Sequence, residues 1–566
     1  MGGFLFVKTT TEPDRVETSL EVFQKKGLAL DRKLIRDGFI VWRFHKRIQT
    51  QEHILELPNG DFVLYTGTLL YCGKVGLPAL TQLHEDFIAG KTLETGLSGH
   101  YAVLLYAHGK LLVFSDYAGY YPVYGDINQT LLSNSYLAVA RLAGAGKLGV
   151  QAFYEYLLFG LLASDDTLLD EVKILNSKYF WNILPNVHAT PRAPHYPPFA
   201  ANASFSEIVE RVAGDLGNYF RTLAENFTAP IGSALSSGYD SRLMLAALRH
   251  LGHTPYLHVY GKPNSDDVVV AKAISVGENI PVEHVDKSTF PKISPDAFAA
   301  IIEEQAYFFD CIKPVGIIDD GTDLSSRMHR ASKASLQLNG GGGEIYREIW
   351  NLSDRNIGLQ DFLRMRFDRG VYPFCRGPFD LDTIFANFTQ KAQNIVGIER
   401  DWISRREAET LEPFLRNLFA APNNAANNQI SYSLLPFMDP SLFIPSFDIP
   451  IKHKYCGEFQ ARLIQFLAPT LAKYPSHYGI NFSDPIPPRY RLLRLIERNI
   501  PLKIRLLKRS KISLAGPRPY YFADDYLSQV FDLSNLKVAE YVDIDKIDNP
   551  EILSRALSVE LLLSHL

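Results

Sequence analysis

Short apolar segments bounded by turn residues fill the first quarter of the chain, from Phe4 to about Ala140. Segments of this length, rich in Phe, Tyr, Val and Leu, predict β-strands. Six are expected, at residues 4–7, 39–44, 62–65, 101–106, 111–115 and 131–134. Residues 100–106 and 110–116, joined at Ala107-His108-Gly109, predict a hairpin. The pattern favours packed β layers.

The pattern changes after residue 205, where a helical period runs to residue 227. Short apolar segments then alternate with helical ones: strands are expected to end near Ala234 and Gly261 and to cover 282–285, with helices between them. This β-α-β-α-β order predicts a parallel, doubly wound sheet that binds ligands at the carboxyl ends of its strands. Five prolines between Pro185 and Pro198 indicate an extended crossover and separate a domain at 1–190 from one at 200–566.

Composition narrows the class of protein. With 566 residues and 46% hydrophobic content, the chain has the profile of a multidomain globular protein. A net charge of −4 gives no electrostatic argument for a nucleic-acid partner. No signal peptide or membrane span is expected. The four cysteines are far apart, which argues against a zinc site or a disulfide framework and favours a cytoplasmic setting: Cys72, Cys311, Cys375 and Cys456.

The first candidate site is the stretch 235–242, Leu-Ser-Ser-Gly-Tyr-Asp-Ser-Arg, between a predicted strand and a predicted helix. Small residues at 236–238 let backbone N–H groups approach a phosphate, and the helix directs its positive end to the same place. Asp240 would repel that phosphate unless a cation lies between them, which suggests Mg²⁺. The alternative is a helix capped by Ser236 or Ser237.

The second candidate site is a strand that ends in four glycines and an acid, Leu336 to Glu344, with a helix expected after it. Four consecutive glycines forfeit conformational entropy, so they indicate close backbone approach, for example to a ligand, rather than a linker. Asp266 and Asp267 are expected to be helix caps rather than ligand contacts. His258 and His284 are expected in the core or at an edge.

These motifs resemble a known family. Residues 235–242 resemble the Ser-Gly-Gly-x-Asp-Ser loop of the ATP pyrophosphatases, with Ser237 in place of the first Gly. Residues 98–106 and 115–124 resemble the glutaminase half of asparagine synthetases, 339–344 their Ser-Gly-Glu-Gly-x-Asp segment, and 434–440 their Val-Pro-Phe-Leu-Asp segment. The chain resembles members of the asparagine synthetase superfamily without a glutaminase cysteine, such as β-lactam synthetases and lasso-peptide cyclases.

The resemblance implies an α/β fold: an N-terminal-nucleophile-hydrolase-like layered domain over 1–190 and a doubly wound ATP-pyrophosphatase domain over 200–566. It implies that Asp240 and Glu344 hold Mg²⁺ and that Lys511, or Lys508 in its place, approaches the phosphates. The residues implied to contact ATP are Leu235, Ser236, Ser237, Gly238, Asp240, Ser241, Val259, Gly340 and Gly342.

The implied activity is ATP-dependent amide-bond formation through an acyl adenylate, in specialised-metabolite or modified-peptide biosynthesis. The expected partners are a small-molecule or peptide carboxylate, an amine, and a peptide-delivery or carrier protein. The sequence leaves open the identity of the carboxylate and the amine, whether the amide is intramolecular, and the oligomeric state.

Several residues depart from the family pattern. Gly2 stands where the catalytic cysteine is required, so the glutaminase half is expected to be a structural relic. Residues 431–433, Ser-Tyr-Ser, replace a Glu-Ala-Arg motif beside the acceptor pocket and indicate a different acceptor. Two alternatives remain: an ammonia-dependent asparagine synthetase, and a non-catalytic scaffold, which the departures at Ser237, Gly341 and Glu344 favour.

Overall fold

The computed structural model describes residues 2–9, 13–48, 53–227, 230–368, 370–509 and 516–566. The N-terminal part contains two antiparallel six-stranded sheets. The first has the order β10-β8-β9-β1-β3-β2, with β1 (Gly3–Lys8), β2 (Leu30–Arg36), β3 (Phe39–Phe44), β8 (Tyr124–Asp126), β9 (Leu131–Ser133) and β10 (Val172–Ile174). The second has the order β12-β11-β7-β6-β5-β4, with β4 (Leu55–Glu56), β5 (Phe62–Tyr71), β6 (Leu97–Ala107), β7 (Lys110–Ser115), β11 (Tyr179–Leu184) and β12 (His188–Pro191).

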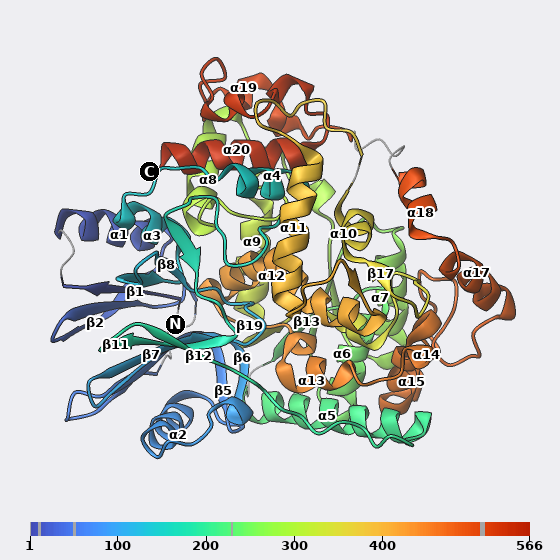
Figure 1. The fold of residues 1–566 in the computed structure, drawn as a ribbon. Helices are drawn as coiled ribbons and strands as arrows, with labels where there is room; N and C mark the ends of the chain where they lie inside the picture. The colour runs from blue at the N-terminus through green and yellow to red at the C-terminus, as the bar shows by residue number, and fades with distance from the viewer. Residues whose placement is uncertain (1, 10–12, 49–52, 228–229, 369, 510–515) are drawn as a thin grey trace.

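The two sheets form the inner layers of a sandwich. Phe4, Phe6 and Val41 of the first sheet share a buried core with Leu64 and Leu104 of the second. Helices α1 (Pro13–Lys25) and α3 (Tyr136–Ala143) cover the outer face of the first sheet, and α2 (Gly76–Ile88) covers that of the second (Figure 1). The packed β layers are therefore confirmed. The predicted hairpin is β6–β7, closed by His108 and Gly109, both at positive φ as a two-residue turn requires.

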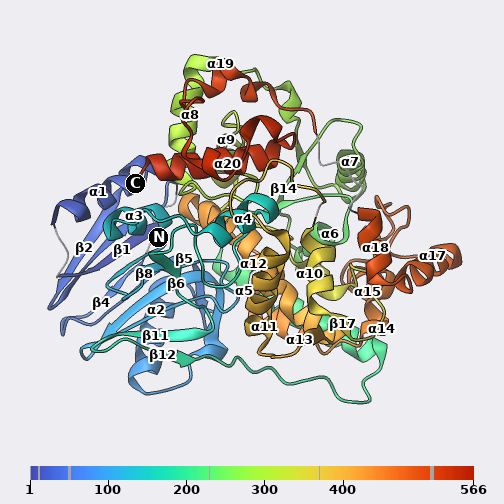
Figure 2. The same ribbon diagram turned by 45° about the horizontal axis from the view of Figure 1, so that its top comes forward.

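The chain crosses to the C-terminal part through residues 192–204, which form neither helix nor strand and run along the lower edge of the molecule in Figure 2. Arg192 anchors the start of this segment. Its guanidinium pairs with Glu94 at 3.0 Å and donates to the Ser115 carbonyl at 2.6 Å. Helix α5 (Phe205–Asn226) follows, with a capping box between Ser204 and Glu207.

A five-stranded, fully parallel sheet organises the C-terminal part, as predicted. Its order is β15-β14-β13-β16-β19, with β13 (Ile231–Ala234), β14 (Tyr256–Tyr260), β15 (Val282–Val285), β16 (Leu336–Leu338) and β19 (Tyr432–Leu434). The chain builds outward from β13 to β15 and then returns to place β16 on the other side of β13. This reversal creates a topological switch point between β13 and β16.

The two faces of this sheet differ in polarity. Leu257, Val259 and Leu336 pack into an apolar core with α5, α6 (Tyr239–His250), α7 (Asp266–Glu278) and α15 (Glu458–Leu467). On the opposite face, His258, Gln337 and Asn339 line a cavity beside α9 (Thr322–Lys333). Because successive side chains of a strand point to opposite faces, the same sheet has one apolar face and one polar face.

Helices from both halves share one further core. It combines α1 and α3 with α4 (Val150–Phe159), α8 (Pro295–Phe308), α9, α10 (Leu359–Phe367), α11 (Leu381–Val396), α12 (Arg405–Ile430) and α20 (Pro550–Ser564). No described helix is both long and apolar enough to cross a bilayer.

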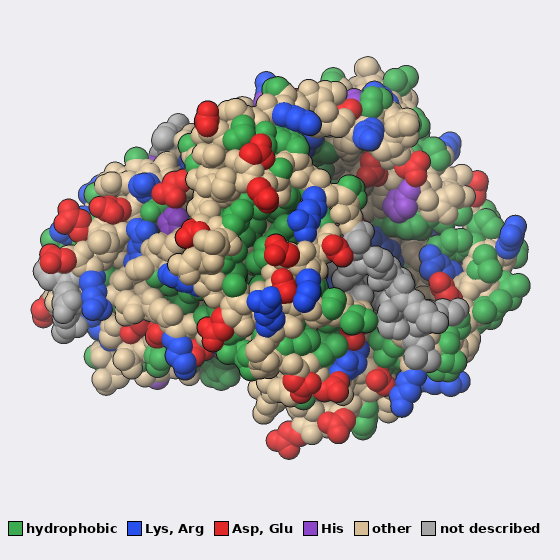
Figure 3. All heavy atoms as spheres, turned by 90° about the horizontal axis from the view of Figure 1, so that it is seen from above, with side chains coloured by type: hydrophobic (Ala, Val, Ile, Leu, Met, Phe, Trp, Pro, Cys, Tyr) green, Lys and Arg blue, Asp and Glu red, His purple; other side chains and the backbone are tan. Residues whose placement is uncertain are grey.

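A stretch rich in Arg and Lys forms two helices, α17 (Pro488–Arg498) and α18 (Leu502–Arg509), with Pro501 between them. The apolar side chains of α17 are exposed, with Leu492 and Leu493 each at 56%, and Figure 3 shows this green surface at the right-hand edge.

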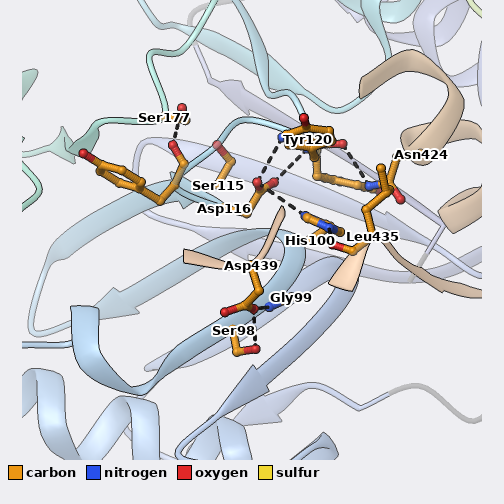
Figure 4. A network of polar contacts seen from close by, with 12 residues as sticks. Ser98, Gly99, His100, Ser115, Asp116, Tyr120, Ser177, Asn424, Leu435 and Asp439 are labelled. Carbon is orange, nitrogen blue, oxygen red and sulfur yellow. Dashed lines mark hydrogen bonds and ion pairs between the residues drawn. The ribbon is translucent and has the colours of Figure 1, made fainter. Parts of the chain in front are cut away.

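A buried polar network joins the two halves (Figure 4). Asp439, 1% exposed, accepts hydrogen bonds from the Ser98 hydroxyl at 2.6 Å and the Gly99 N–H at 3.0 Å through one oxygen. Its other oxygen caps α13 (Pro440–Ser446) by accepting from the N–H and hydroxyl of Ser441. Four donors thus compensate this buried carboxylate, which forms no ion pair with a described basic side chain.

Replacing Asp439 with Ala should destabilise the protein by about 2 to 4 kcal/mol, because buried donors on both sides of the junction lose their acceptor. Thermal denaturation of Asp439→Ala checks this. Asp532→Ala is the matched control, since the exposed Asp532 side chain accepts described hydrogen bonds only from nearby Ser534. Equal transition temperatures for the two variants would contradict the role assigned to Asp439.

Candidate functional site

The switch point brings the two predicted loops together, and the glycines make their contact possible. A Cβ on Gly343 would lie 2.3 Å from Oδ1 of Asp240, and one on Gly340 would lie 3.3 Å from the N atom of Ser241. Gly342 has φ +92°, and a Cβ there would meet the Met438 methyl at 2.3 Å. The glycines are therefore explained by close approach to the protein itself. Only one 3-10 turn (Gly343–Tyr346) follows, instead of the expected helix.

The backbone donors of residues 236–238 bind side chains of the protein. The Ser236 N–H donates to Oγ of Ser241 at 3.0 Å. The N–H and hydroxyl of Ser237 both donate to Oδ1 of Asp267, at 2.8 and 2.6 Å. Neither serine caps α6, because its N-cap is Gly238 and no side chain caps this helix. An anion bound here would lie at a helix N-terminus that no side chain caps. It would also displace Ser241 and Asp267, which accept the hydrogen bonds of this loop.

Three residues contact this loop in ways that the sequence did not predict. Asp267 lies in the first turn of α7, whose N-cap is Ser265, and its side chain reaches Ser237; the expected cap is therefore a loop contact. His477 places Nδ1 2.8 Å from Oγ of Ser237. Buried Arg242 holds the segment that contains His477, because it donates to the carbonyls of Tyr474 and Pro475. None of these contacts has a local sequence signal, since each joins distant parts of the chain.

A guanidinium separates the two acids. Arg347 binds Asp240 through both terminal nitrogens, with Nη2 3.1 Å from Oδ2, and Nη2 lies 3.9 Å from Oε1 of Glu344. Gln460 donates to Oδ1 of Asp240 at 2.8 Å. Burial raises the pKa of Asp240, and Arg347 offsets this only in part. Burial opposes charge on Arg347, yet the two carboxylates hold its pKa above the ordinary value.

This donor set does not fit a resident Mg²⁺ between Asp240 and Glu344. Magnesium requires oxygen ligands in octahedral geometry, but N–H donors engage both oxygens of Asp240. Nowhere in the described ranges do three or more His, Cys, Asp or Glu side chains gather as a metal site. The cation between the acids is the guanidinium of Arg347, so a metal at this pair stays a prediction that this arrangement of donors does not support.

The remaining predicted residues lie in different environments. Ser236, Gly238 and Ser241 stand at the start of α6. Leu235 and Val259 are 1% and 2% exposed, so their side chains belong to the apolar core. Lys511 and the side chain of Lys508 fall outside the described residues.

The start of the chain has no space for a nucleophilic side chain. A Cβ on Gly2 would lie 2.5 Å from the carbonyl oxygen of His45, which is backbone. Asn134 closes the same position by donating to the Gly2 carbonyl at 3.1 Å and accepting from the Phe4 N–H at 2.9 Å. A side chain at position 2 would therefore require the backbone of His45 to move, and the glutaminase relic stays a prediction.

No protein-family model matches the sequence, and no curated protein shows significant similarity to it. Among solved structures, the chain is similar to the allosteric regulatory enzyme of purine biosynthesis, with TM-score 0.22 and 9% identity over 52% of this chain and 82% of that one. It is also similar to glutamine phosphoribosylpyrophosphate amidotransferase from B. subtilis, complexed with ADP and GMP, with TM-score 0.21 and 10% identity over 50% and 65% of the chains. Because both TM-scores are low, these similarities establish no function.

Arg347→Met should destabilise the protein by about 3 kcal/mol at pH 7.5, because it leaves the Asp240 carboxylate uncompensated. The pKa of Asp240, already raised by burial, should rise further. The folded state then binds a proton that the unfolded state lacks at the same pH, so the variant loses stability as pH rises through the folded pKa. Thermal denaturation should show a smaller loss at pH 5 than at pH 7.5. Arg406→Met, which breaks an exposed pair with Asp448, is the control; a loss independent of pH would refute this assignment.

Gly2→Cys should yield no ammonia from glutamine and should lower stability by about 1 to 3 kcal/mol through overpacking against the His45 carbonyl. Gly146→Cys is the matched control, because a Cβ there meets nothing within 4 Å. Ammonia release by the native chain or by Gly2→Cys would show that the relic interpretation is wrong.

Proposed function

We propose that the chain is an ATP-dependent ligase that activates a substrate carboxylate as an acyl adenylate and transfers the acyl group to an amine. The observation that carries this proposal is the meeting of the 235–242 and 338–344 loops at the switch point between β13 and β16. Open parallel sheets bind ligands at such points, beyond the carboxyl ends of their strands.

The local chemistry supports a polyphosphate ligand. The uncapped N-terminus of α6 favours negative charge, and the hydroxyls of Ser236 and Ser241, 2.8 Å apart, can donate to phosphate oxygens. Arg347 supplies a fixed positive charge suited to bidentate phosphate contact. In this proposal the positive charge between Asp240 and Glu344 belongs to Arg347, and no step of the reaction depends on Mg²⁺ at that position. Lys511 keeps its proposed role near the phosphates.

In the proposed reaction, a carboxylate oxygen attacks the α-phosphorus of ATP, and the bond to pyrophosphate breaks. The amine nitrogen then attacks the acyl carbon, the bond to AMP breaks, and the amine loses a proton. Fixed donors at the loop would stabilise charge on the departing pyrophosphate. The proposed substrates are a small-molecule or peptide carboxylate and an amine, with a peptide-delivery or carrier protein as a proposed partner.

A specific observation favours a second candidate, a non-catalytic scaffold. Asp267 satisfies the Ser237 donors, and Arg347 with Gln460 satisfies Asp240, so both loops are complete without a ligand. A scaffold would retain these contacts and bind no nucleotide.

Calorimetric titration with a non-hydrolysable ATP analogue distinguishes the two candidates. The ligase proposal predicts that the ATP analogue binds with Mg²⁺ present and also in EDTA, because the cation of the site is the Arg347 side chain, which a chelator cannot remove. Arg347→Met should weaken binding at least about tenfold, or 1.4 kcal/mol, with partial rescue by Arg347→Lys and no change in Arg406→Met.

The absence of binding by the folded native chain would favour the scaffold. For a chain that binds ATP, product analysis tests the reaction type, and release of ADP and phosphate rather than AMP and pyrophosphate would contradict the proposal.

A further inference from the structure

A cavity of about 310 Å³ lies on the polar face of the parallel sheet, at the carboxyl ends of its strands. Its walls combine Ala234 of β13, His258 of β14 and Ser433 of β19 with side chains of α9. A second cavity, of about 610 Å³, shares Arg327, Arg330, Asn339 and Asn427 with the first and extends to Gly341. These volumes are in the range of small-molecule sites, roughly 300 to 1,000 Å³.

Basic side chains outnumber acids in the smaller cavity. Lys287, Arg327 and Arg330 line it together with one carboxylate, Asp323. Asp323 is already engaged, because it pairs with Arg327 at 3.1 Å and with Lys313 at 2.8 Å. Arg327 is also saturated, since it donates to the side-chain oxygens of Asn423 and Asn427. The cavity therefore retains positive charge that its own acid does not neutralise.

Lys287 and Arg330 carry this uncompensated charge. Both lie over the ring of Tyr260, with Nζ of Lys287 5.2 Å and Cζ of Arg330 5.3 Å from the ring centroid. Arg330 also donates to the Tyr260 hydroxyl. Neither residue forms an ion pair with a carboxylate of the described ranges. Burial lowers the pKa of Lys287, and Arg330 lowers it further, whereas Asp323 acts in the opposite direction. Two neighbouring cations held on one ring favour an anion between them.

Two buried polar atoms of the wall also lack a partner. Nδ1 of His258 and Oγ of Ser433 make no hydrogen bond within the described part of the chain, although these residues are only 5% and 1% exposed. Burial lowers the pKa of His258 to about 3, so its ring is neutral and offers one N–H donor. Buried polar atoms are almost always satisfied in folded proteins, so these two mark the layer directly beneath the cavity surface as polar.

We propose that this cavity binds a small polyanion, a molecule with two or more carboxylate or phosphate groups, held by Lys287 and Arg330 against a wall that includes His258 and Ser433. The cavity shares Asn339 with the glycine-rich turn, where the Asn339 side chain accepts from the Gly341 N–H at 2.8 Å. The polyanion thus binds next to the switch point. Its role as the carboxylate substrate rests on the proposed function, whereas the anion site itself does not.

Calorimetric titrations with citrate and, separately, with inorganic pyrophosphate test the site in the full chain. Lys287→Met and Arg330→Met should each weaken citrate binding at least about tenfold, since each removes one of two uncompensated charges. Lys333→Met is the matched control, because Lys333 is exposed on the same α9 and should leave the affinity within about twofold of native. Lys287→Arg keeps the positive charge and should bind citrate more tightly than Lys287→Met does.

The possible outcomes are distinct. Lys287 forms no ion pair in the described fold, so Lys287→Met keeps the test valid if Arg330→Met fails to fold. Binding of neither anion by the native chain, or equal weakening in Lys333→Met, would overturn the proposal. Binding of pyrophosphate alone, weakened by Arg347→Met and not by Lys287→Met, would place the anion at the loops and also overturn it. Citrate binding without ATP-analogue binding would support the cavity while the proposed ligase function fails.

Discussion

The contact between the glycine-rich turn and the first turn of α6 is the constraint on which the C-terminal half depends. The Asp240 carboxylate occupies the space that a side chain at Gly343 would need. Arg347 then binds this carboxylate from the turn that follows β16. The result is a partly buried charge pair across the switch point, and such pairs are costly unless further hydrogen bonds complete them, as Gln460 does here. The positive charge at this position is therefore a side chain of the protein, Arg347.

The alternation of side chains along the parallel strands determines what surrounds this contact. On one face, Leu257 and Val259 bury apolar surface against helices, which holds the sheet in place. On the other face, His258 and Tyr260 of the same strand border open space with basic residues of α9 and Lys287. The sheet therefore provides a rigid apolar support for a polar chamber. Rigid secondary structure of this kind orients binding groups better than loops do.

The elements could be predicted because their signals are local. The strand at Val282–Val285 and the β6–β7 hairpin follow from apolar periodicity and turn residues within short windows. Strand order predicted three parallel strands, whereas only the family resemblance implied that Asp240 and Glu344 lie together. The partners of the loops could not be predicted. Arg347 follows Glu344 by three residues in an irregular segment, and only the three-dimensional structure shows that its guanidinium reaches Asp240 across 107 positions.

The same distinction explains why Asp267 was interpreted as a cap. Aspartate in the first turn of a helix is favourable for the helix dipole, and that local reason is sufficient in the sequence. In the structure the parallel pairing of β13 and β14 brings the loops after these two strands together, so Asp267 meets Ser237 instead. The expectation that the glycines approach a ligand was likewise incomplete, because their nearest neighbours are protein atoms.

The β sandwich of the N-terminal half has a structural role in these contacts. The hydroxyl of Thr68 on β5 donates to Asn428 at 2.7 Å and accepts from the Ser433 N–H at 3.1 Å. Ser98 and Gly99 on β6 hold Asp439, which ends the segment after β19. The N-terminal sheets thereby fix β19, the edge strand whose Ser433 lines the basic cavity. Loss of the sandwich would expose that edge and remove one wall of the chamber, so the N-terminal half is needed for the geometry of the C-terminal site whether or not it catalyses a reaction itself.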